Sequence, residues 1–255
     1  MTFFELGVPS AEARVVAAEV VSRIASSQSM REAELKVREL LMRTTTREGN
    51  LLESVQKGWR QRADKIFSQL SPLLQGTPGK IFDYGMGSGA VTQRLKEELG
   101  LDIEGGDVRD FRMPHVTVPF VALQPPSPGG GIVQVPDGYY GTAILTNVIH
   151  HEEENEIILK ELDRIVEHKL VIIETVPDGA SPDDQKRDLE RTFANDALWN
   201  RFFVHADIPV PGTFETGEDW IRRFSQYGWK CSHSENLGYD QAGLRIVHHL
   251  LVFER

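Results

Sequence analysis

Two kinds of hydrophobic periodicity divide the chain near residue 78. Before that point, apolar residues recur every three to four positions. This predicts three amphipathic helices, one capped by Ser10, one capped by Ser29 and one over residues 50–74. After Lys80, short apolar runs alternate with helical patterns, which predicts strands at 80–83, 102–106, 119–123, 142–146 and 170–174. Such alternation is typical of a parallel sheet with helices on both faces.

The last part of the chain has a different pattern. Residues 228–255 contain two strand-like runs joined by a loop of Gly, Asn and Asp residues. This predicts an antiparallel strand pair added to the parallel sheet. Loops at 123–131 and 176–184 follow the carboxyl ends of predicted strands, where ligand crevices of open α/β sheets lie.

A turn with three glycines follows the first strand, in "IFDYGMGSGAVTQRLKEELG" from Ile81 to Gly100. Glycines allow a sharp turn and the close approach of a ligand, and the helix that follows offers unpaired N–H groups. The segment also satisfies the dinucleotide pattern G-x-G-x-x-G/A. However, Asp83 stands two residues before Gly85, where a carboxylate disfavours a diphosphate. It suits a ligand with an ammonium and a sulfonium, such as S-adenosylmethionine; the alternative is that Asp83 caps the turn or the helix.

A second acid, Asp107, ends the second predicted strand, 18 residues after Gly89. A carboxylate at this place can accept hydrogen bonds from both ribose hydroxyls of a nucleotide, in NAD sites and in S-adenosylmethionine sites alike. The alternative is an acidic loop, because Glu104 and Asp110 lie nearby in the sequence.

Several segments together resemble the motifs of class I S-adenosylmethionine-dependent methyltransferases, in the broad group that contains the ubiquinone- and menaquinone-pathway enzymes. They are "FDYGMGSG", the acid of "GGDV", "VPDGYYGTAILTNVIHH", "ILKELDRIV" and "VIIETV". The resemblance implies a Rossmann-like methyltransferase sheet, mostly parallel with a C-terminal antiparallel pair. It also implies S-adenosylmethionine as cofactor and S-adenosylhomocysteine as product. The residues implicated in cofactor binding are Asp83, Gly85, Gly87, Ser88, Gly89, Asp107, Val108, Leu123, Gln124 and Asn147.

The chain departs from that family at two places. Gly141 stands where the family usually has an acid. Leu123 and Gln124 stand where the family usually has an Asp- or Asn-containing contact to adenine. The adenine contacts are therefore the least defined part of the predicted site.

Candidates for the chemistry follow the fourth strand and fill a later insertion. Asn147, His150 and His151 lie at the expected mouth of the site and are candidates to face cofactor or acceptor. A histidine has a suitable pKa for a general base, so His150, His151 and His205 are the catalytic candidates. The alternative is that these histidines only pack or bond to backbone. The aromatic-rich insertion at 177–216 supplies the candidates for acceptor binding, Asp196, Trp199, Asn200 and His205, although its aromatics alternatively only seal the sheet.

Composition and charge limit the class of partner. The 255 residues carry a net charge of −10, which argues against tight binding to nucleic acid or an anionic membrane. Residues 1–80 differ, with 12 basic and 9 acidic residues. The single cysteine, Cys231, excludes an intrachain disulfide, and no histidines occur with paired carboxylates at metal-ligand spacing. We expect no metal, no membrane span and a cytoplasmic location.

We therefore expect a helical extension over 1–78 and a methyltransferase domain over 79–255. The predicted function is methyl transfer to oxygen, nitrogen or carbon of a small molecule. One alternative is an RNA or protein methyltransferase that docks its substrate on the basic N-terminal helices. Another is an NAD-dependent oxidoreductase or a non-catalytic cofactor binder. The N-terminal helices are also candidates for a homodimer surface.

Overall fold

The computed structural model describes residues 8–46, 49–125, 132–177, 182–198, 200, 209–241 and 244–255. The chain forms two compact units. The first contains residues 1–62, 178–210 and 239–246, and the second contains 63–177, 211–238 and 247–255. The division falls inside the long helix α4 (Leu51–Leu74), so the domain boundary at residue 78 stays a prediction.

The first unit is built on α2 (Ser10–Ala25) and α3 (Met30–Arg43), followed by the short antiparallel strands β1 (Thr45–Thr46) and β2 (Gly49–Asn50). Helix α7 (Pro182–Leu198) also belongs to it. Ser29 caps α3 as predicted, because its hydroxyl accepts from Glu32 N at 3.2 Å. The prediction for Ser10 was wrong, since Pro9 is the cap residue and no side chain caps α2. The apolar stripes form a core of Val8, Ala13, Val16, Val20, Ala33, Val37, Leu40, Leu41, Leu51 and Ile246.

A seven-stranded sheet in the order β5-β4-β3-β6-β7-β9-β8 belongs to the second unit, except for the adjoining ends of β8 and β9 within 239–246, which belong to the first. The strands are β3 (Ile81–Tyr84), β4 (Ile103–Asp107), β5 (Phe120–Ala122), β6 (Tyr140–Thr146), β7 (Val166–Val176), β8 (Lys230–Gln241) and β9 (Leu244–Glu254). The first five are parallel, and β9 lies antiparallel to β7. The parallel sheet and the antiparallel C-terminal strand are therefore confirmed.

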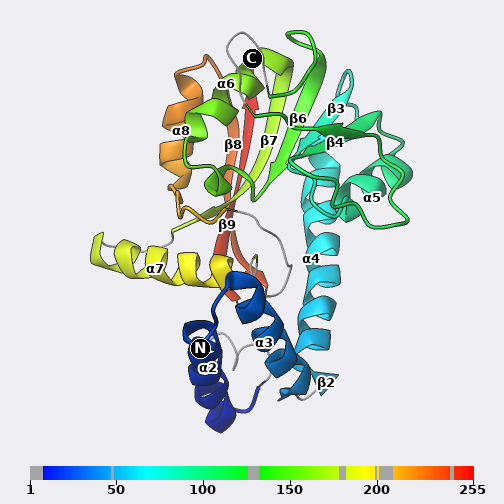
Figure 1. Ribbon diagram of the computed structural model, residues 1–255. Helices are drawn as coiled ribbons and strands as arrows, with labels where there is room; N and C mark the ends of the chain where they lie inside the picture. Colours follow the sequence, from blue (N-terminus) through cyan, green and yellow to red (C-terminus); the bar gives the residue numbers. More distant parts are fainter. Residues whose placement is uncertain are drawn as a thin grey trace. The chain divides into compact units, whose positions relative to one another are not determined.

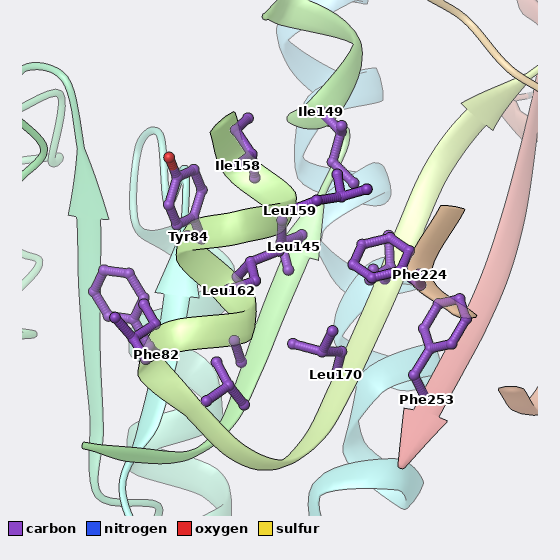
Figure 2. Packing of buried hydrophobic residues seen from close by; sticks show 14 of the residues in the cluster. Phe82, Tyr84, Leu145, Ile149, Ile158, Leu159, Leu162, Leu170, Phe224 and Phe253 are labelled. Carbon is purple, nitrogen blue, oxygen red and sulfur yellow. The ribbon is translucent and has the colours of Figure 1, made fainter. Parts of the chain in front are cut away.

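Helices cover both faces of this sheet. Successive strand residues point to opposite faces, so Phe82 and Tyr84 of β3 belong to one core with apolar residues of α6 (Asn155–Ile165) and α8 (Gly217–Ser225). Figure 1 shows these two helices along one face, and Figure 2 shows the core beneath them. Ile81 faces the other way, toward the C-terminal part of α4 and α5 (Ala90–Leu99). None of the described helices combines the length and the apolar composition needed to cross a bilayer.

The packing of the sheet explains why a glycine stands at position 141. Gly141 N donates to Lys80 O at 2.9 Å, which holds the start of β6 against the chain that enters β3. A Cβ on Gly141 would lie 2.2 Å from Pro78 O. No side chain fits at this position, so this departure reflects backbone packing and says nothing about a ligand.

A packing prediction arises beside the glycine turn. A Cβ on Gly105 of β4 would lie 2.3 Å from Met86 Sδ, so Gly105→Ala overpacks the buried Met86. We expect a loss of about 1–3 kcal/mol of unfolding free energy, measured by urea denaturation. The double variant with Met86→Ala should lose less than the sum of the two single variants, because Met86→Ala makes room for the new methyl group. If the loss of unfolding free energy in the double variant equalled the sum of the two single losses, the new methyl group at position 105 would not contact the Met86 side chain.

Candidate functional site

The carboxyl ends of the parallel strands gather the sequence-predicted residues at one edge of the sheet. Tyr84 of β3 pairs in register with Gly106 of β4 and with Leu145 of β6. The glycine turn, Asp107 and Asn147 follow these residues directly, and they therefore emerge side by side. Open α/β sheets bind ligands at this edge.

The three glycines of the turn are required for different reasons. All have positive φ angles, 77° at Gly85, 53° at Gly87 and 71° at Gly89. A Cβ on Gly85 would lie 2.5 Å from Val148 Cγ2, and one on Gly89 would lie 2.8 Å from Met86 Cε, so packing excludes side chains there. A Cβ on Gly87 would meet nothing within 4 Å. Gly87 therefore leaves open space at the tip of the turn, where a ligand can approach the backbone.

Asp83 lies beneath this turn with 5% of its surface exposed. Its carboxylate accepts a short hydrogen bond from the Thr92 hydroxyl in the first turns of α5. Burial raises the pKa of Asp83 to about 7; the Thr92 bond opposes this rise and the Asp107 charge adds to it. This bond comes from a side-chain hydroxyl and not from a backbone N–H of α5, and no side chain caps the start of that helix. The cofactor role of Asp83 stays a prediction.

Asp107 sits against the turn from the neighbouring strand. Its Oδ2 accepts from Gly87 N at 2.9 Å, and its Oδ1 accepts from Val108 N at 2.7 Å. Burial raises the pKa of Asp107 above its ordinary value, and these two bonds partly oppose the rise. The N–H of the central glycine, which a dinucleotide turn offers to a diphosphate, is thus occupied by a carboxylate. Two acids flank the turn and make it unfavourable for an anion.

The remaining predicted cofactor residues lie within the turn, after β4 and after β5. Ser88 and Val108 are exposed, and the Ser88 carbonyl accepts from Met113 N at 3.0 Å. Leu123 is buried and its N–H donates to Asp107 O at 3.0 Å. Gln124 is exposed and its N–H donates to Ile132 O at 2.9 Å. The main chain after β5 is therefore held to Asp107, and the roles of the Leu123 and Gln124 side chains toward adenine stay predictions.

Asn147 occupies a left-handed backbone conformation after β6, with φ at 54°. Its N–H donates to Ile173 O at 2.8 Å, and its Oδ1 accepts from the Thr175 hydroxyl at 3.0 Å. Its Nδ2 is shielded from solvent and has no hydrogen-bond partner among the described residues. Asparagine adopts this region more readily than other non-glycine residues, because its short polar side chain can form hydrogen bonds nearby.

His150 is held by a buried acid at the end of β7. Its ring Nδ1 lies 2.9 Å from Glu174 Oε2, and Glu174 also accepts from the N–H groups of Val148 and His150 at 3.0 and 3.3 Å. The His150 ring is 1% exposed and stacks on Phe214 with a centroid distance of 4.8 Å. His151 is partly exposed, with its ring centroid 4.2 Å from that of His150. Glu174 therefore organises the segment after β6 and fixes the His150 ring.

Comparisons with known proteins identify this architecture. A scan against protein-family models and a search of curated proteins found no match. Among solved structures, the 4+2 cyclase SpnF matches with a TM-score of 0.55 and 14% identity, over 78% of this chain and 82% of that one. A SAM-dependent methyltransferase from Methanosarcina mazei matches with a TM-score of 0.50 and 12% identity, over 70% and 93%. Magnesium protoporphyrin IX methyltransferase from Synechocystis PCC 6803 with bound SAM matches with a TM-score of 0.50 and 14% identity, over 90% and 99%.

The chain has the class I methyltransferase fold. In this methyltransferase fold, the edge that carries the glycine turn, Asp107 and Asn147 is formed entirely by the second unit. Asp196 and Asn200 belong to the first unit, where Asn200 Nδ2 donates to Asp196 Oδ1 at 2.8 Å. Trp199 and His205 lie outside the described residues. The acceptor-binding and base roles of these four residues stay predictions.

Sequence reasoning missed the partners of the predicted residues in this methyltransferase fold. Thr92 bonds Asp83, Glu174 bonds His150 and Thr175 bonds Asn147. A signal existed for Glu174, because an acid at the end of the otherwise apolar run "VIIETV" needs a buried partner. Thr92 and Thr175 carry no such signal, since threonine is common in helices and strands with apolar neighbours.

Proposed function

We propose that this chain is an S-adenosylmethionine-dependent methyltransferase that acts on a small-molecule acceptor. The observation that carries the proposal is the glycine turn flanked by two carboxylates, Asp83 with Thr92 and Asp107 with Gly87 N–H. A diphosphate is disfavoured there, whereas a ligand with two positive charges is favoured. The Synechocystis enzyme of the same fold is named with bound SAM and with bound SAH.

The residues present fit such a cofactor. The open space at Gly87 receives the part of the ligand that passes the turn, and Asp107 offers two oxygens to ribose hydroxyls. Asp83 supplies negative charge for the amino-acid part. Ser88, Val108, Leu123, Gln124 and Asn147 complete the proposed contacts with the cofactor. When bound, the cofactor supplies a methyl group on a sulfonium, which is already activated for transfer.

The contribution of the protein is alignment and exclusion of water, because an activated methyl group needs mainly an in-line partner. Glu174 and Asn147 hold the segment after β6 at the edge where the methyl group would lie. A general base is needed only for acceptors that lose a proton as they attack. His150, His151 and His205 are the proposed bases for that case, and Asp196, Trp199, Asn200 and His205 the proposed acceptor contacts.

One alternative is that the chain binds the same cofactor but does not catalyse methyl transfer. SpnF is named a cyclase and shares this fold, so the fold alone does not define the reaction. Macromolecular substrates are less favoured by the net charge of −10, although the basic residues among 1–80 keep an RNA or protein acceptor as a second candidate. A homodimer through the N-terminal helices and a cytoplasmic location stay predictions.

Isothermal titration of the purified chain with SAM, SAH and NADH tests the proposal. We expect SAM and SAH to bind and NADH not to bind. At a hundredfold excess over its Kd, SAH should raise the unfolding free energy by about 2.7 kcal/mol. Release of SAH from SAM in the presence of an acceptor then separates a methyltransferase from a cofactor binder. Binding of NADH without binding of SAH would contradict the proposal.

A further inference from the structure

Strand β8 forms a free edge of the seven-stranded sheet. It is the last strand in the sheet order, and among the described strands it pairs with β9 only. The residues from 232 to 236 are all exposed. In an edge strand, every second residue presents its main-chain N–H and C=O away from the sheet, where a further strand can pair with them. The β8 edge is therefore a template for extension of the sheet unless its own residues prevent pairing.

The residues that usually protect an edge are missing from the exposed stretch 232–236. Natural edge strands are commonly blocked by proline, by lysine or by a bulge. The stretch "SHSEN" contains neither proline nor lysine, and Glu235 alone in it carries a full charge at neutral pH. Gly238, which departs from strand geometry with φ at 67°, lies beyond the stretch. The main chain of 232–236 is therefore able to pair.

A groove beside this edge leaves room on the α4 face of the sheet. It has a volume of about 450 Å³, and it is lined by His233 and Glu235 of β8, by Leu250 of β9 and by residues of α4. The side chains of His233 and Glu235 are 48% and 55% exposed. Ser234 between them faces the other way, and its hydroxyl lies 2.8 Å from Nε2 of His249. Helix α4 therefore leaves both side chains within reach of a strand placed beside β8.

The sequence around Ser234 is chemically symmetric. In an antiparallel pair of two copies centred on Ser234, residues equally far before and after it lie opposite each other. His233 then lies opposite Glu235 of the second copy, and an imidazole N–H can donate to a carboxylate. In the same way Ser232 lies opposite Asn236, and the two Ser234 residues face each other. No like charges oppose each other, so the stretch is complementary to its own copy.

We propose that β8 pairs with β8 of a second copy of this chain, antiparallel and centred on Ser234. Such a dimer is symmetric, so the contact between His233 and Glu235 forms twice. Within one strand, His233 Nε2 lies 3.2 Å from Glu235 Oε2, which leaves the other carboxylate oxygen for the second copy. This surface differs from the N-terminal helices considered from the sequence, because residues 230–238 belong to the second unit. The dimer joins the two sheets into one.

Sedimentation velocity of the full chain over a range of concentrations measures the Kd of the dimer. His233→Glu places two carboxylates opposite each other at both contacts and should raise the Kd at least about tenfold. Adding Glu235→Lys restores opposite charges between the strands and should return the Kd to within about threefold of the wild-type value. The control, His168→Glu, makes the same change in β7 on a side chain that is 50% exposed, and it should leave the Kd unchanged. A monomer at every concentration, or an unchanged Kd in His233→Glu, would overturn the proposal.

Disulfide formation tests the register of the two strands. Cys231→Ser removes the single cysteine of the chain. In that background, Ser234→Cys brings two thiols opposite each other with Cα atoms about 4.5–5.5 Å apart, which a disulfide can span. We expect a covalent dimer on a non-reducing gel after mild oxidation. Ser232→Cys in the same background is the matched control and should stay monomeric on that gel, because its counterpart lies four residues away along the pair. Equal cross-linking of the two variants, or none in Ser234→Cys, would overturn the proposal.

Discussion

Replacing Gly87 by alanine should weaken the binding of S-adenosylhomocysteine at least about tenfold, or about 1.4 kcal/mol. The methyl group at this position enters space that is empty to at least 4 Å in the free protein, so it disturbs no packing. The same space is where we propose that the cofactor passes the turn, so a side chain there collides with the ligand. Isothermal titration at constant pH and salt measures the loss.

Gly100 offers a matched control for the backbone effect. It ends α5 with φ at 66°, close to the 53° of Gly87, and a Cβ there also meets nothing within 4 Å. Gly100→Ala and Gly87→Ala should each cost about 1 kcal/mol of stability, because alanine is strained in this conformation. Only Gly87→Ala should lose affinity. Equal affinities in the two variants would show that the cofactor does not approach the turn at Gly87.

Two strands could be predicted closely from the sequence, because a short apolar start and a following Gly-rich turn or acid mark their place in the chain. β3 and β4 agree with the predicted ranges within one residue. β6 begins earlier than predicted, at Tyr140, because that residue pairs with Val166 of β7. β7 begins at Val166, in a polar stretch that becomes a strand only by pairing with β6. Tertiary pairing, which local periodicity does not report, decides both boundaries.

The part of the candidate site that could be predicted from the sequence consists of residues whose type and spacing are set within one short motif. The three glycines and the two acids follow from the spacing around β3 and β4, and the structure brings them together. The donor state of the Asn147 amide depends on Thr175, 28 residues later, and the orientation of His150 depends on Glu174. These pairs depend on the register of β6 with β7, so they become visible only when the sheet is known.

Asp83→Asn should make the ligand-free protein more stable above pH 7. The folded state holds the pKa of Asp83 at about 7 because the carboxyl is buried, whereas an unfolded aspartate titrates near 3.9. Between these values the folded state binds more protons than the unfolded state. The unfolding free energy of the wild-type protein therefore falls as pH rises through this window and levels off above pH 7. The full cost is on the order of 4 kcal/mol for three pKa units, and asparagine avoids it while still accepting from Thr92.

Urea unfolding of both proteins between pH 5.5 and 8.5 measures this effect. The difference in unfolding free energy should grow by about 2 kcal/mol up to pH 7 and then stay constant. The exposed Asp102 provides the control, and Asp102→Asn should show no such growth. A pH-independent difference for Asp83→Asn would mean that Asp83 is ionised in the folded state throughout.

Asp83 should also make cofactor binding depend on pH, but in the opposite direction: stability falls as pH rises, whereas affinity for the cofactor increases. A cationic ligand stabilises the ionised form of Asp83, so its binding releases a proton at pH 6 and none at pH 8. The affinity for S-adenosylmethionine should therefore rise as pH rises through 7, and this rise should disappear in Asp83→Asn. We therefore expect Asp83→Asn to be more stable than the wild-type protein without ligand, and to bind S-adenosylmethionine more weakly and with less dependence on pH. This combination is expected if the buried Asp83 carboxylate binds a cationic ligand. A pH-dependent affinity that persists in Asp83→Asn would assign the titration to Asp107 instead.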